Sequence, residues 1–589
     1  MSSPKIILNN KQAVGAIAIL ALFVLAAVPF SRNVADDPAI PPRIPATFPA
    51  TWRYHPGASA TFATHAMVAS DNRIASEVGA QIMKDGGNAV DAAVATGFAL
   101  AVTYPEAGNI GGGGYMVIRM ADGRVATLDY RETAPLAATR DMYVGPDGNV
   151  NGQSVIGPKA SGVPGSVAGM LEAHRRFGVL PLAKVMAPAI RLASDGFVVD
   201  SIFTRSLSSE RYRIESFDGK ATFFPNGAPP QVGARFAQPA LAHTLRLIAD
   251  SGAAPFYRGS IADSIAAHMK RSGGLITRED LARYRAIWRT PIRSSYRGYG
   301  LIAMPPSSSG GTTVTEMLQI LEAYGPATRF GSAERVHAVA SASQRAFIDR
   351  NSKLGDPAFV KVPLSTLISK TYARAVARTI SRSHADPTSG VVALREGSQT
   401  THYSVVDQHG NAVATTTTLN DLYGSGVYVP SVGFFLNDEM DDFTSKPGVP
   451  NMYGLIQGEA NAIAPGKRML SAMSPTIVLD PRGNLLLIVG ARGGPRIISA
   501  TADIILNVID HRMSLADAMS APRIHHQSLP DSIRLETGGF DSATIARLHQ
   551  MGHTTYEQFG IASAEAIMHV RGGYEGMPDP RSRGAAVGF

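Results

Sequence analysis

The feature that most constrains the fold is a pair of compact, β-branched segments in the second part of the chain. Residues 401–407 (THYSVVD) and 412–419 (AVATTTTL) are joined by turn-forming residues at 408–411, a pattern that predicts a β-hairpin. A second hairpin is predicted over residues 476–489, with its turn at 481–483. A chain with such blocks is expected to build sheets that other elements must cover.

Helical patterns surround these strands and supply the covering elements. The stretch Ile74–Lys84 reads as a helix that stops at Gly86 and Gly87, and Asn88 can cap a second helix that ends before Pro105. Further helices are predicted over residues 237–250, 332–352 and 541–551. Together the strands and helices predict a layered α+β fold, with helices on the outside.

Composition excludes several kinds of chemistry. The chain of 589 residues has no cysteine, which removes thiol catalysis, disulfides and cysteine-based zinc sites. Its net charge of +8 comes from scattered Lys and Arg without a run of five, so we expect no nucleic-acid partner. The GxSxG, GxxxxGKS/T and HExxH signatures do not occur.

Two further patterns have structural interpretations. The glycine run at 111–114 fits neither dinucleotide nor phosphate spacing, and it predicts a turn or a tight backbone approach. His525 and His526 are adjacent, so on an extended segment they point in opposite directions, and no third ligand stands out. We therefore expect a structural role for this pair and no metal site.

The N-terminus resembles an export signal. Lys5 and Lys11 precede an uncharged, apolar stretch at 13–30, longer than a usual signal core and close to the length that spans a bilayer. Residues 1–35 are therefore predicted to be a signal peptide or an N-terminal membrane anchor, and 36–60 a linker. In either case we expect the rest of the chain to be exported, to the periplasm or the extracellular space.

A threonine is the remaining candidate nucleophile. A Thr hydroxyl is weak unless a base lies beside it, and a Thr at a chain start carries that base as its own α-amino group. The Gln399–Thr400 bond joins a polar, turn-rich stretch at 382–399 to the first predicted strand, which suits self-cleavage. The position of Thr400 alone is weak evidence for a nucleophile, because most Thr residues at strand starts are there for their β-propensity.

Longer motifs decide between these interpretations. From about residue 58 to the C-terminus, the chain resembles the γ-glutamyltranspeptidase (glutathione hydrolase) family of N-terminal-nucleophile hydrolases. The motifs that carry the resemblance are PEAGNIGGGGYM (105–116), LDYRETAP (128–135), TTHYSVVD (400–407), LNDEMDDF (436–443), KPGVPNMYG (446–454) and MSPTIV (473–478). It implies a four-layer αββα sandwich, cut at Gln399/Thr400 into a large subunit (61–399) and a small catalytic subunit (400–589) that form one globular unit.

The resemblance also implies the catalytic residues. Thr400 matches the nucleophile, and Thr418 matches the threonine that hydrogen-bonds it. Gly493 and Gly494 match the pair whose amides form the oxyanion hole, a task for which glycines allow a close backbone approach.

Substrate-binding residues follow in the same way. Arg131 matches the arginine that grips the substrate α-carboxylate, for which its planar fork is suited. The groups that receive the α-ammonium are matched by Asn420, Glu439 and Asp442. Tyr453 matches the tip of the lid loop. The pair near the carboxylate is Ser471-Ala472.

Two positions depart from the family pattern. Ala472 stands where a second serine is usual. If the missing hydroxyl bound the carboxylate, binding should weaken by about 1.5–3 kcal/mol; if only the backbone N–H at this position is used, nothing is lost. Arg492 and Pro495 flank the glycine pair in place of the usual Pro and Ser. We expect the extra charge of Arg492 to affect substrate preference.

The implied activity is γ-glutamyl transfer from glutathione and related compounds to water or to amino acid and peptide acceptors, without a cofactor. One alternative is a cephalosporin or glutaryl acylase specificity on the same fold, which the predicted ammonium site disfavours. The other is an unprocessed protein that binds γ-glutamyl ligands without turning them over.

Overall fold

The computed structural model describes residues 43–388 and 400–589, which belong to the compact unit Ile40–Phe589. Two seven-stranded sheets form its centre, and every hydrogen-bonded pair of strands in them is antiparallel. In sheet order, the first sheet consists of β21 (Ala585–Gly588), β2 (Met67–Ser70), β10 (Thr401–Val406), β11 (Ala412–Thr418), β3 (Gly113–Arg119), β4 (Val125–Asp129) and β7 (Ile287–Arg289). The second consists of β1 (Thr61–Ala63), β20 (Gly573–Pro578), β19 (Ser563–Val570), β15 (Leu485–Arg492), β14 (Thr476–Leu479), β9 (Tyr299–Ala303) and β8 (Ile292–Tyr296).

Both predicted hairpins are confirmed. The strands β10 and β11 pair in the register Thr401–Thr417, and the Asp407 carboxylate accepts the His409 and Asn411 amides in their turn. The strands β14 and β15 form the second hairpin. An aspartate again closes the turn, since Asp480 accepts the amides of residues 482 and 484.

Side chains of β10 alternate between the two faces of the first sheet, as strand geometry requires. Tyr403 and Val405 belong to the apolar core beneath one helix layer, whereas Val406 belongs to the core between the sheets. His402 also faces the second sheet, and a Cβ on Gly490 would lie 2.4 Å from its ring. The strand β10, which begins one residue after Thr400, is therefore packed on both sides.

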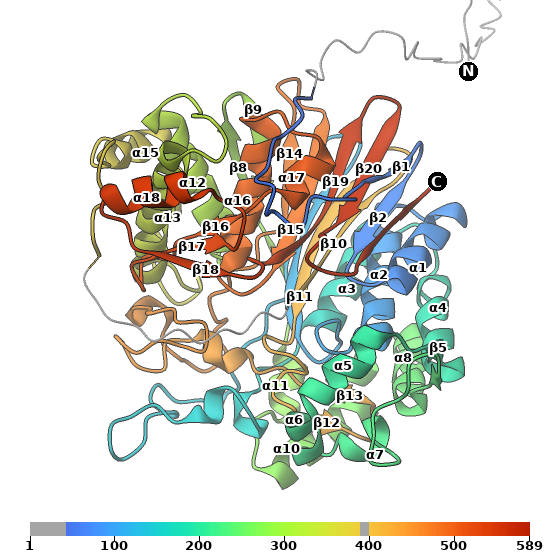
Figure 1. Ribbon diagram of the computed structural model, residues 1–589. Coiled ribbons are helices and arrows are strands. Elements are labelled where there is room, and N and C mark those ends of the chain that lie inside the picture. Colours follow the sequence, from blue (N-terminus) through green and yellow to red (C-terminus); the bar gives the residue numbers. More distant parts are fainter. Residues whose placement is uncertain (1–42, 389–399) are drawn as a thin grey trace, which may run out of the picture. The chain divides into compact units, whose positions relative to one another are not determined.

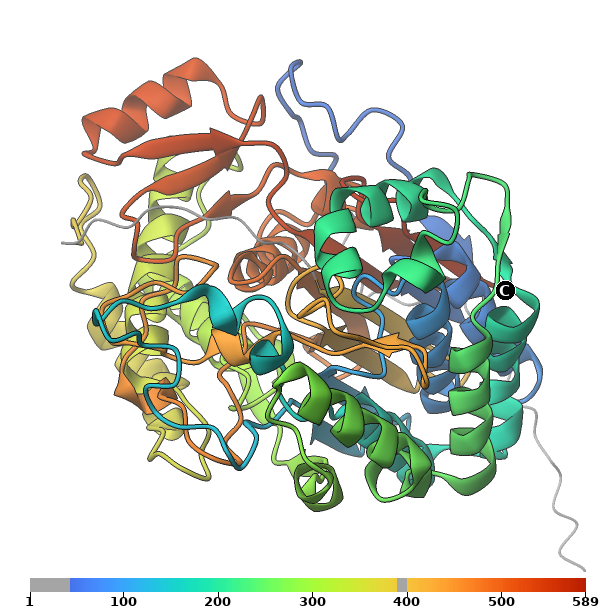
Figure 2. The ribbon, with the colours of Figure 1, turned by 90° about the horizontal axis from the view of Figure 1, so that it is seen from below.

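Helices cover the outer face of each sheet, so the predicted αββα order is confirmed. The first sheet is covered by α1 (Arg73–Lys84), α2 (Ala89–Thr103) and α3 (Ser166–Phe177), with α4 (Leu182–Asp195) and α8 (Pro239–Ser251) packed on them. The second is covered by α12 (Gly310–Tyr324), α16 (Arg496–Ile509) and α17 (Leu515–Ser520), with α13 (Ala333–Lys353) outside. Figure 1 shows these two groups on opposite sides of the strands, and Figure 2 shows the same separation from below.

The predicted helices match α1, α2, α8, α13 and α18 (Ser542–Gln550). Asn88 caps α2 as expected, in a capping box with Asp91. Smaller elements before residue 389 are η1 (Gly152–Ser154), η2 (Pro158–Ala160), β5 (Phe197–Val198), α5 (Ser201–Ser209), α6 (Arg211–Ser216), α7 (Lys220–Phe223), β6 (Arg235–Phe236), α9 (Ala254–Tyr257), α10 (Ser260–Ser272), α11 (Arg278–Arg283), α14 (Leu364–Leu367) and α15 (Lys370–Ala377). Those after residue 400 are β12 (Tyr428–Val429), β13 (Phe434–Phe435), η3 (Glu439–Asp442), η4 (Glu459–Asn461), β16 (Ile524–His525), β17 (Ile533–Glu536) and β18 (Thr555–Gln558).

The N-terminal predictions fall largely outside the described residues. This holds for the signal or anchor over 1–35, including the apolar stretch at 13–30, and for the first part of the linker at 36–60. Within 43–388 and 400–589, none of the helices has the length and apolar character needed to cross a bilayer. Residues 43–60 contain neither helix nor strand.

Candidate active site

The candidate nucleophile lies where the central hairpin begins. Thr400 immediately precedes β10 and is buried, with 4% of its surface exposed. The hairpin register places it opposite Thr418, and the two Oγ1 atoms are 3.4 Å apart. The Thr418 Oγ1 also accepts the Asn420 amide at 2.8 Å. Thr418 therefore holds the Thr400 hydroxyl in place, and it is held in turn by the residue two positions on.

Only one of the two residues at the predicted cleavage site belongs to the described part of the chain. Thr400 is described, whereas Gln399 and the rest of 389–399 lie outside the described residues. Cleavage at the Gln399–Thr400 bond therefore stays a prediction.

The glycine pair follows β15 and adopts a conformation that suits glycine. Gly493 has φ of +131° and Gly494 of +57°, which L-residues with side chains rarely adopt. A Cβ on Gly494 would lie 2.8 Å from the Tyr453 ring. Gly494 lines the same cavity as Thr400. Its backbone can therefore approach a reacting carbonyl that a side chain would block.

A buried charge cluster lines the same cavity as Thr400, the candidate nucleophile. Arg131, two residues after β4, is fully buried; its Nη1 lies 2.5 Å from the Glu439 carboxylate, and its Nη2 bonds Asp442. The Nε donates to the Met469 carbonyl at 3.3 Å, and the Glu132 carboxylate is 3.6 Å from Nη1. The short helix η3 presents Glu439 and Asp442 together, so one guanidinium bridges both predicted ammonium-binding acids.

Burial governs the protonation of this cluster. It raises the pKa of Glu439 well above the usual range, although Arg131 opposes the shift, and it raises that of Glu132 to about 8. The pKa of Asp442 is also raised by burial, against the pull of Arg131. Burial alone lowers the pKa of Arg131, but its carboxylate neighbours more than reverse this, so the guanidinium stays charged. Near neutral pH, Glu132 is therefore mostly protonated.

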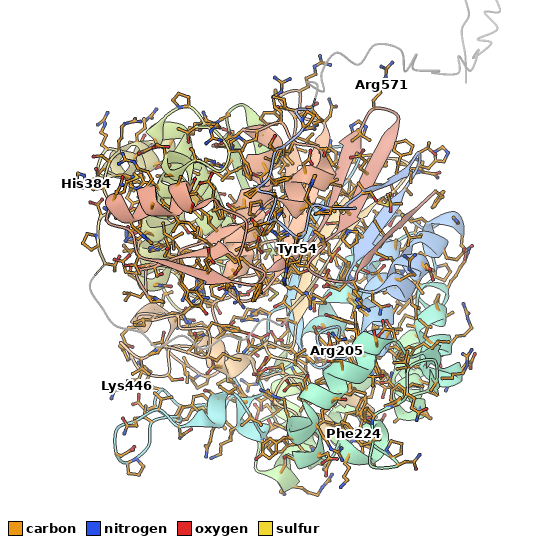
Figure 3. The ribbon with its side chains drawn as sticks, in the orientation of Figure 1. Tyr54, Arg205, Phe224, His384, Lys446 and Arg571 are labelled. Atoms are coloured by element: carbon orange, nitrogen blue, oxygen red, sulfur yellow. The ribbon has the colours of Figure 1, made fainter. Side chains whose placement is uncertain are left out.

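The segment 446–454 closes over the cluster. The Tyr453 hydroxyl donates to the backbone and side-chain oxygens of Asn420, each at 2.9 Å, and Asn420 itself has a positive φ of +83°. The Asp441 carboxylate accepts the Met452 amide at 2.9 Å. At the other end of the segment, Lys446 projects from the edge of the molecule (Figure 3) and donates to the Gly148 carbonyl. The segment is thus tied down on both sides of the site.

The Ser471-Ala472 pair sits on the neighbouring wall. Ser471 is held through its backbone, since its carbonyl accepts the Ser309 amide and its amide donates to the Ser307 carbonyl. Its own Oγ accepts the Met473 amide at 3.2 Å. Ala472 lines the cavity with its methyl group. The departure at 472 therefore removes a polar group from the wall itself.

One small cavity collects these residues. Ten of the eleven residues predicted to act in catalysis or binding line it: Arg131, Thr400, Thr418, Asn420, Glu439, Asp442, Tyr453, Ser471, Ala472 and Gly494; Gly493 is adjacent. Its volume of about 20 Å³ is room for roughly one water molecule. The segment around Tyr453 forms the loop part of the cavity wall.

Sequence reasoning missed Arg350, which also lines the cavity. It is buried on α13, with Nε 3.0 Å from the Ser309 hydroxyl and Nη1 3.1 Å from Gln457. Burial lowers its pKa to about 10, so it is still charged at neutral pH. The available signal was an arginine three residues after Phe347 on the apolar face of the helix predicted over 332–352.

Arg492 lies outside the cavity lining. Its guanidinium is ion-paired with Asp71 at 3.2 Å and donates to the Tyr104 hydroxyl at 2.6 Å. Asp71 also accepts the Thr401 hydroxyl at 2.9 Å. Arg492 thus links the end of β15 to the start of β10, and an effect of its charge on substrate preference stays a prediction.

The glycine run and the histidine pair have structural roles. A Cβ on Gly111 would lie 1.9 Å from the Phe435 carbonyl oxygen, which confirms the tight backbone approach. His525 bonds the Ser499 hydroxyl and the Gln527 side chain, whereas His526 faces Asp531. Among the described residues, no group of three or more His, Asp or Glu side chains could hold a metal ion.

Comparison with known proteins agrees with this geometry. The model of the γ-glutamyltranspeptidase family matches residues 75–589. The chain belongs to this family. It is 46% identical over 533 residues to the glutathione hydrolase proenzyme of Escherichia coli K12. The aligned region covers 88% of this chain and 91% of that relative.

Two solved structures show the likeness in three dimensions. The γ-glutamyltranspeptidase of Helicobacter pylori is 41% identical, with a TM-score of 0.53 over 56% of this chain and 95% of that one. A cephalosporin acylase from Bacillus halodurans is 27% identical, with a TM-score of 0.79 over 93% and 99%. The fold is therefore that of N-terminal-nucleophile hydrolases.

Proposed function

We propose that this chain is a self-processing γ-glutamyltransferase and glutathione hydrolase, with Thr400 as its nucleophile. The observation that supports this best is the placement of a threonine hydroxyl and a cluster of opposite charges around one small cavity. The family match over 75–589 supports the same reaction. No cofactor is needed, because the nucleophile carries its own base.

In the proposed first step, the Thr400 hydroxyl attacks the γ-carbonyl carbon of the donor. Its proton passes to the free α-amino group, whose pKa of about 7.7–8.0 suits this task. The Gly493 and Gly494 amides stabilise the tetrahedral oxyanion, and Thr418 keeps the hydroxyl aligned. The C–N bond then breaks, the amine leaves with the proton, and a γ-glutamyl ester remains on Thr400. Water, or the amino group of an amino acid or peptide, releases it.

The charge cluster supports recognition of a zwitterion. Arg131 is held between Glu439 and Asp442, so a bound carboxylate competes with these two acids for its N–H groups. A substrate that brings an α-ammonium compensates these acids, and the local charge balance is kept. A glutaryl group has no ammonium and would leave a buried acid unpaired, which is unfavourable.

Substrate entry requires the 446–454 segment to open, because the cavity of about 20 Å³ is too small for the donor. Closure then excludes water while the ester forms. The hydrogen bonds from the Tyr453 hydroxyl to Asn420 hold the segment closed and must break when it opens.

The sheet order supports a mature protein of two inseparable chains, a large subunit ending at Gln399 and a small one starting at Thr400. In the first sheet, β2 from the large-subunit region lies between β21 and β10 from the small-subunit region. β11 then pairs with β3 of the large-subunit region. Backbone cleavage would leave these strands hydrogen-bonded.

A cephalosporin or glutaryl acylase is the second candidate, favoured by Ala472 and by the likeness to the Bacillus halodurans acylase. The test compares γ-glutamyl-p-nitroanilide with glutaryl-p-nitroanilide. We expect kcat/KM for the γ-glutamyl compound to exceed that for the glutaryl compound by about 10²-fold. Asp442→Asn should reduce this ratio. A preference for the glutaryl compound would reassign the specificity.

We also infer that the chain is exported, to the periplasm or extracellular space, from the basic, then apolar sequence of residues 1–35. N-terminal sequencing of the large chain distinguishes a removed signal from a retained anchor at 13–30. A chain found in the cytoplasm with Met1 intact would contradict the inference.

A further inference from the structure

A second cavity, of about 720 Å³, shares no lining residue with the active-site cavity. Its walls come from α3, the start of α4, α9 and the segment 284–286 between α11 and β7. Apolar side chains and aromatic rings contribute most of the wall, including Leu171, Leu182 and Tyr257. The volume lies within the range of about 300–1,000 Å³ that is typical of small-molecule sites.

The charged groups of this cavity are mainly cationic. Glu172 and Arg175 neutralise one another in a two-bond pair. Arg285 donates only to the backbone carbonyls of residues 282 and 284, and Arg258 has no carboxylate partner among the described residues. Two arginines are therefore available to an anion at the edge of an apolar chamber.

One wall of the cavity also supports the substrate cluster. The Tyr284 hydroxyl donates to the Arg131 carbonyl at 2.8 Å. The Arg285 carbonyl accepts from Arg468 at 2.6 Å, and Met469, the next residue, accepts the Arg131 Nε. Arg131 is thus attached to the segment 284–286 through two routes.

We propose that this cavity binds an amphipathic monocarboxylate, with its apolar chain among Leu171, Leu182 and Tyr257 and its carboxylate on Arg258 and Arg285. The arginine fork matches a carboxylate in shape and charge. A bound molecule would stabilise the segment 284–286 and the contacts that it makes to Arg131, so it would lower the KM for the γ-glutamyl donor. This last consequence rests on the proposed function; the binding itself does not.

Tryptophan fluorescence can report on the site directly. The chain has two tryptophans; Trp288 donates its indole N–H to Glu172 of the cavity at 2.7 Å, whereas Trp52 bonds the Ser520 carbonyl elsewhere. A Trp52→Phe protein therefore has a single tryptophan, Trp288, next to the cavity. Titration with octanoate should give a saturable change with a Kd below about 1 mM, and octanol, which has no charge, should bind at least about tenfold more weakly.

Variants locate the site. Arg258→Met with Arg285→Met should weaken octanoate binding at least about tenfold, while Arg283→Met, an exposed arginine outside the cavity lining, should leave it unchanged. Ala254→Phe, which fills the cavity from an exposed position, should abolish binding. No saturable signal, equal binding of octanol, or binding that survives Ala254→Phe would each overturn the proposal.

A kinetic arm tests the link to Arg131. Octanoate should lower the KM for γ-glutamyl-p-nitroanilide at least about twofold in the wild-type protein and leave it unchanged in the double arginine variant. An unchanged KM with octanoate bound would refute the coupling. A protein without turnover would refute the proposed function and leave the fluorescence result to decide the site.

Discussion

The two cavities of this molecule differ in size, chemistry and construction. The active-site cavity of about 20 Å³ is lined by buried charges that already satisfy one another, so it can select a ligand by charge balance. The second, of about 720 Å³, is largely apolar and can select mainly by shape. Within the first, Thr400 and Gly494 lie at strand ends, whereas Glu439 lies on the short helix η3 and Tyr453 on a loop. Under the proposed function, the strand ends position the reacting atoms, and the segments between the strands admit and hold the substrate.

If strand ends position the reacting atoms, the largest loss of activity should come from a change at a strand end. Gly494→Ala places a methyl group 2.8 Å from the Tyr453 ring and strains a residue with φ of +57°. We expect kcat to fall by about 10²–10³-fold, as when an oxyanion-hole donor is displaced. The matched control is Gly483→Ala, whose φ is +85° and whose Cβ would meet nothing within 4 Å. Equal loss in both variants would show backbone strain, and not the oxyanion hole, at work.

Changes in the charge cluster should act on binding. Arg131→Lys keeps the charge but loses the fork that spans Glu439 and Asp442. We expect kcat/KM for γ-glutamyl-p-nitroanilide to fall by about 10–100-fold, mostly through KM. Arg124→Lys, at an exposed arginine paired with Asp122, is the control. A fall confined to kcat would place Arg131 in the chemical step. It would contradict the assignment of the charge cluster to substrate binding.

Loss of the hydrogen bond between Tyr453 and Asn420 should reduce activity less than changes in the charge cluster do. Tyr453→Phe removes the hydroxyl that donates to Asn420 but keeps the ring over Gly494. Loss of an ordinary hydrogen bond, about 0.5–1.5 kcal/mol, predicts a two- to tenfold fall in kcat/KM. Tyr212→Phe, at a tyrosine that is 80% exposed, serves as the control. Steady-state kinetics measure this fall in kcat/KM. A fall of more than about tenfold would indicate that the Tyr453 hydroxyl contacts the reacting carbonyl.

The smallest effect is on pH dependence. Burial raises the pKa of Glu132 to about 8, so this acid is neutral at pH 7 and gains a negative charge as the pH rises past 8. That charge, 3.6 Å from Arg131, competes with the substrate carboxylate. We expect KM to rise between pH 7 and 9. Glu132→Gln should lack this component while keeping the titrations of the Thr400 amine and the substrate amine. Identical KM profiles would exclude Glu132.

The sequence predicts much of this architecture because the signals are local. The hairpin strands and the Asn88 cap each follow from residues within a few positions. The roles of Thr400 and Arg131 needed the family motifs, since a strand-initial threonine and a lone arginine have no distinctive local pattern. The ion pair between Arg131 and Asp442 joins residues 311 positions apart. Arg350 and Tyr284 reach the cluster through similar tertiary contacts, which periodicity cannot reveal.

The central claim is that Thr400 becomes a chain start and then acts as the nucleophile. Intact-mass measurement of the purified protein, with N-terminal sequencing of each chain, tests this most directly. The account predicts two chains that meet at Gln399/Thr400 in the wild-type protein and one uncut chain in Thr400→Ala. A wild-type protein that stays as a single chain at neutral pH, or a Thr400→Ala protein that still cleaves itself at this bond, would contradict it.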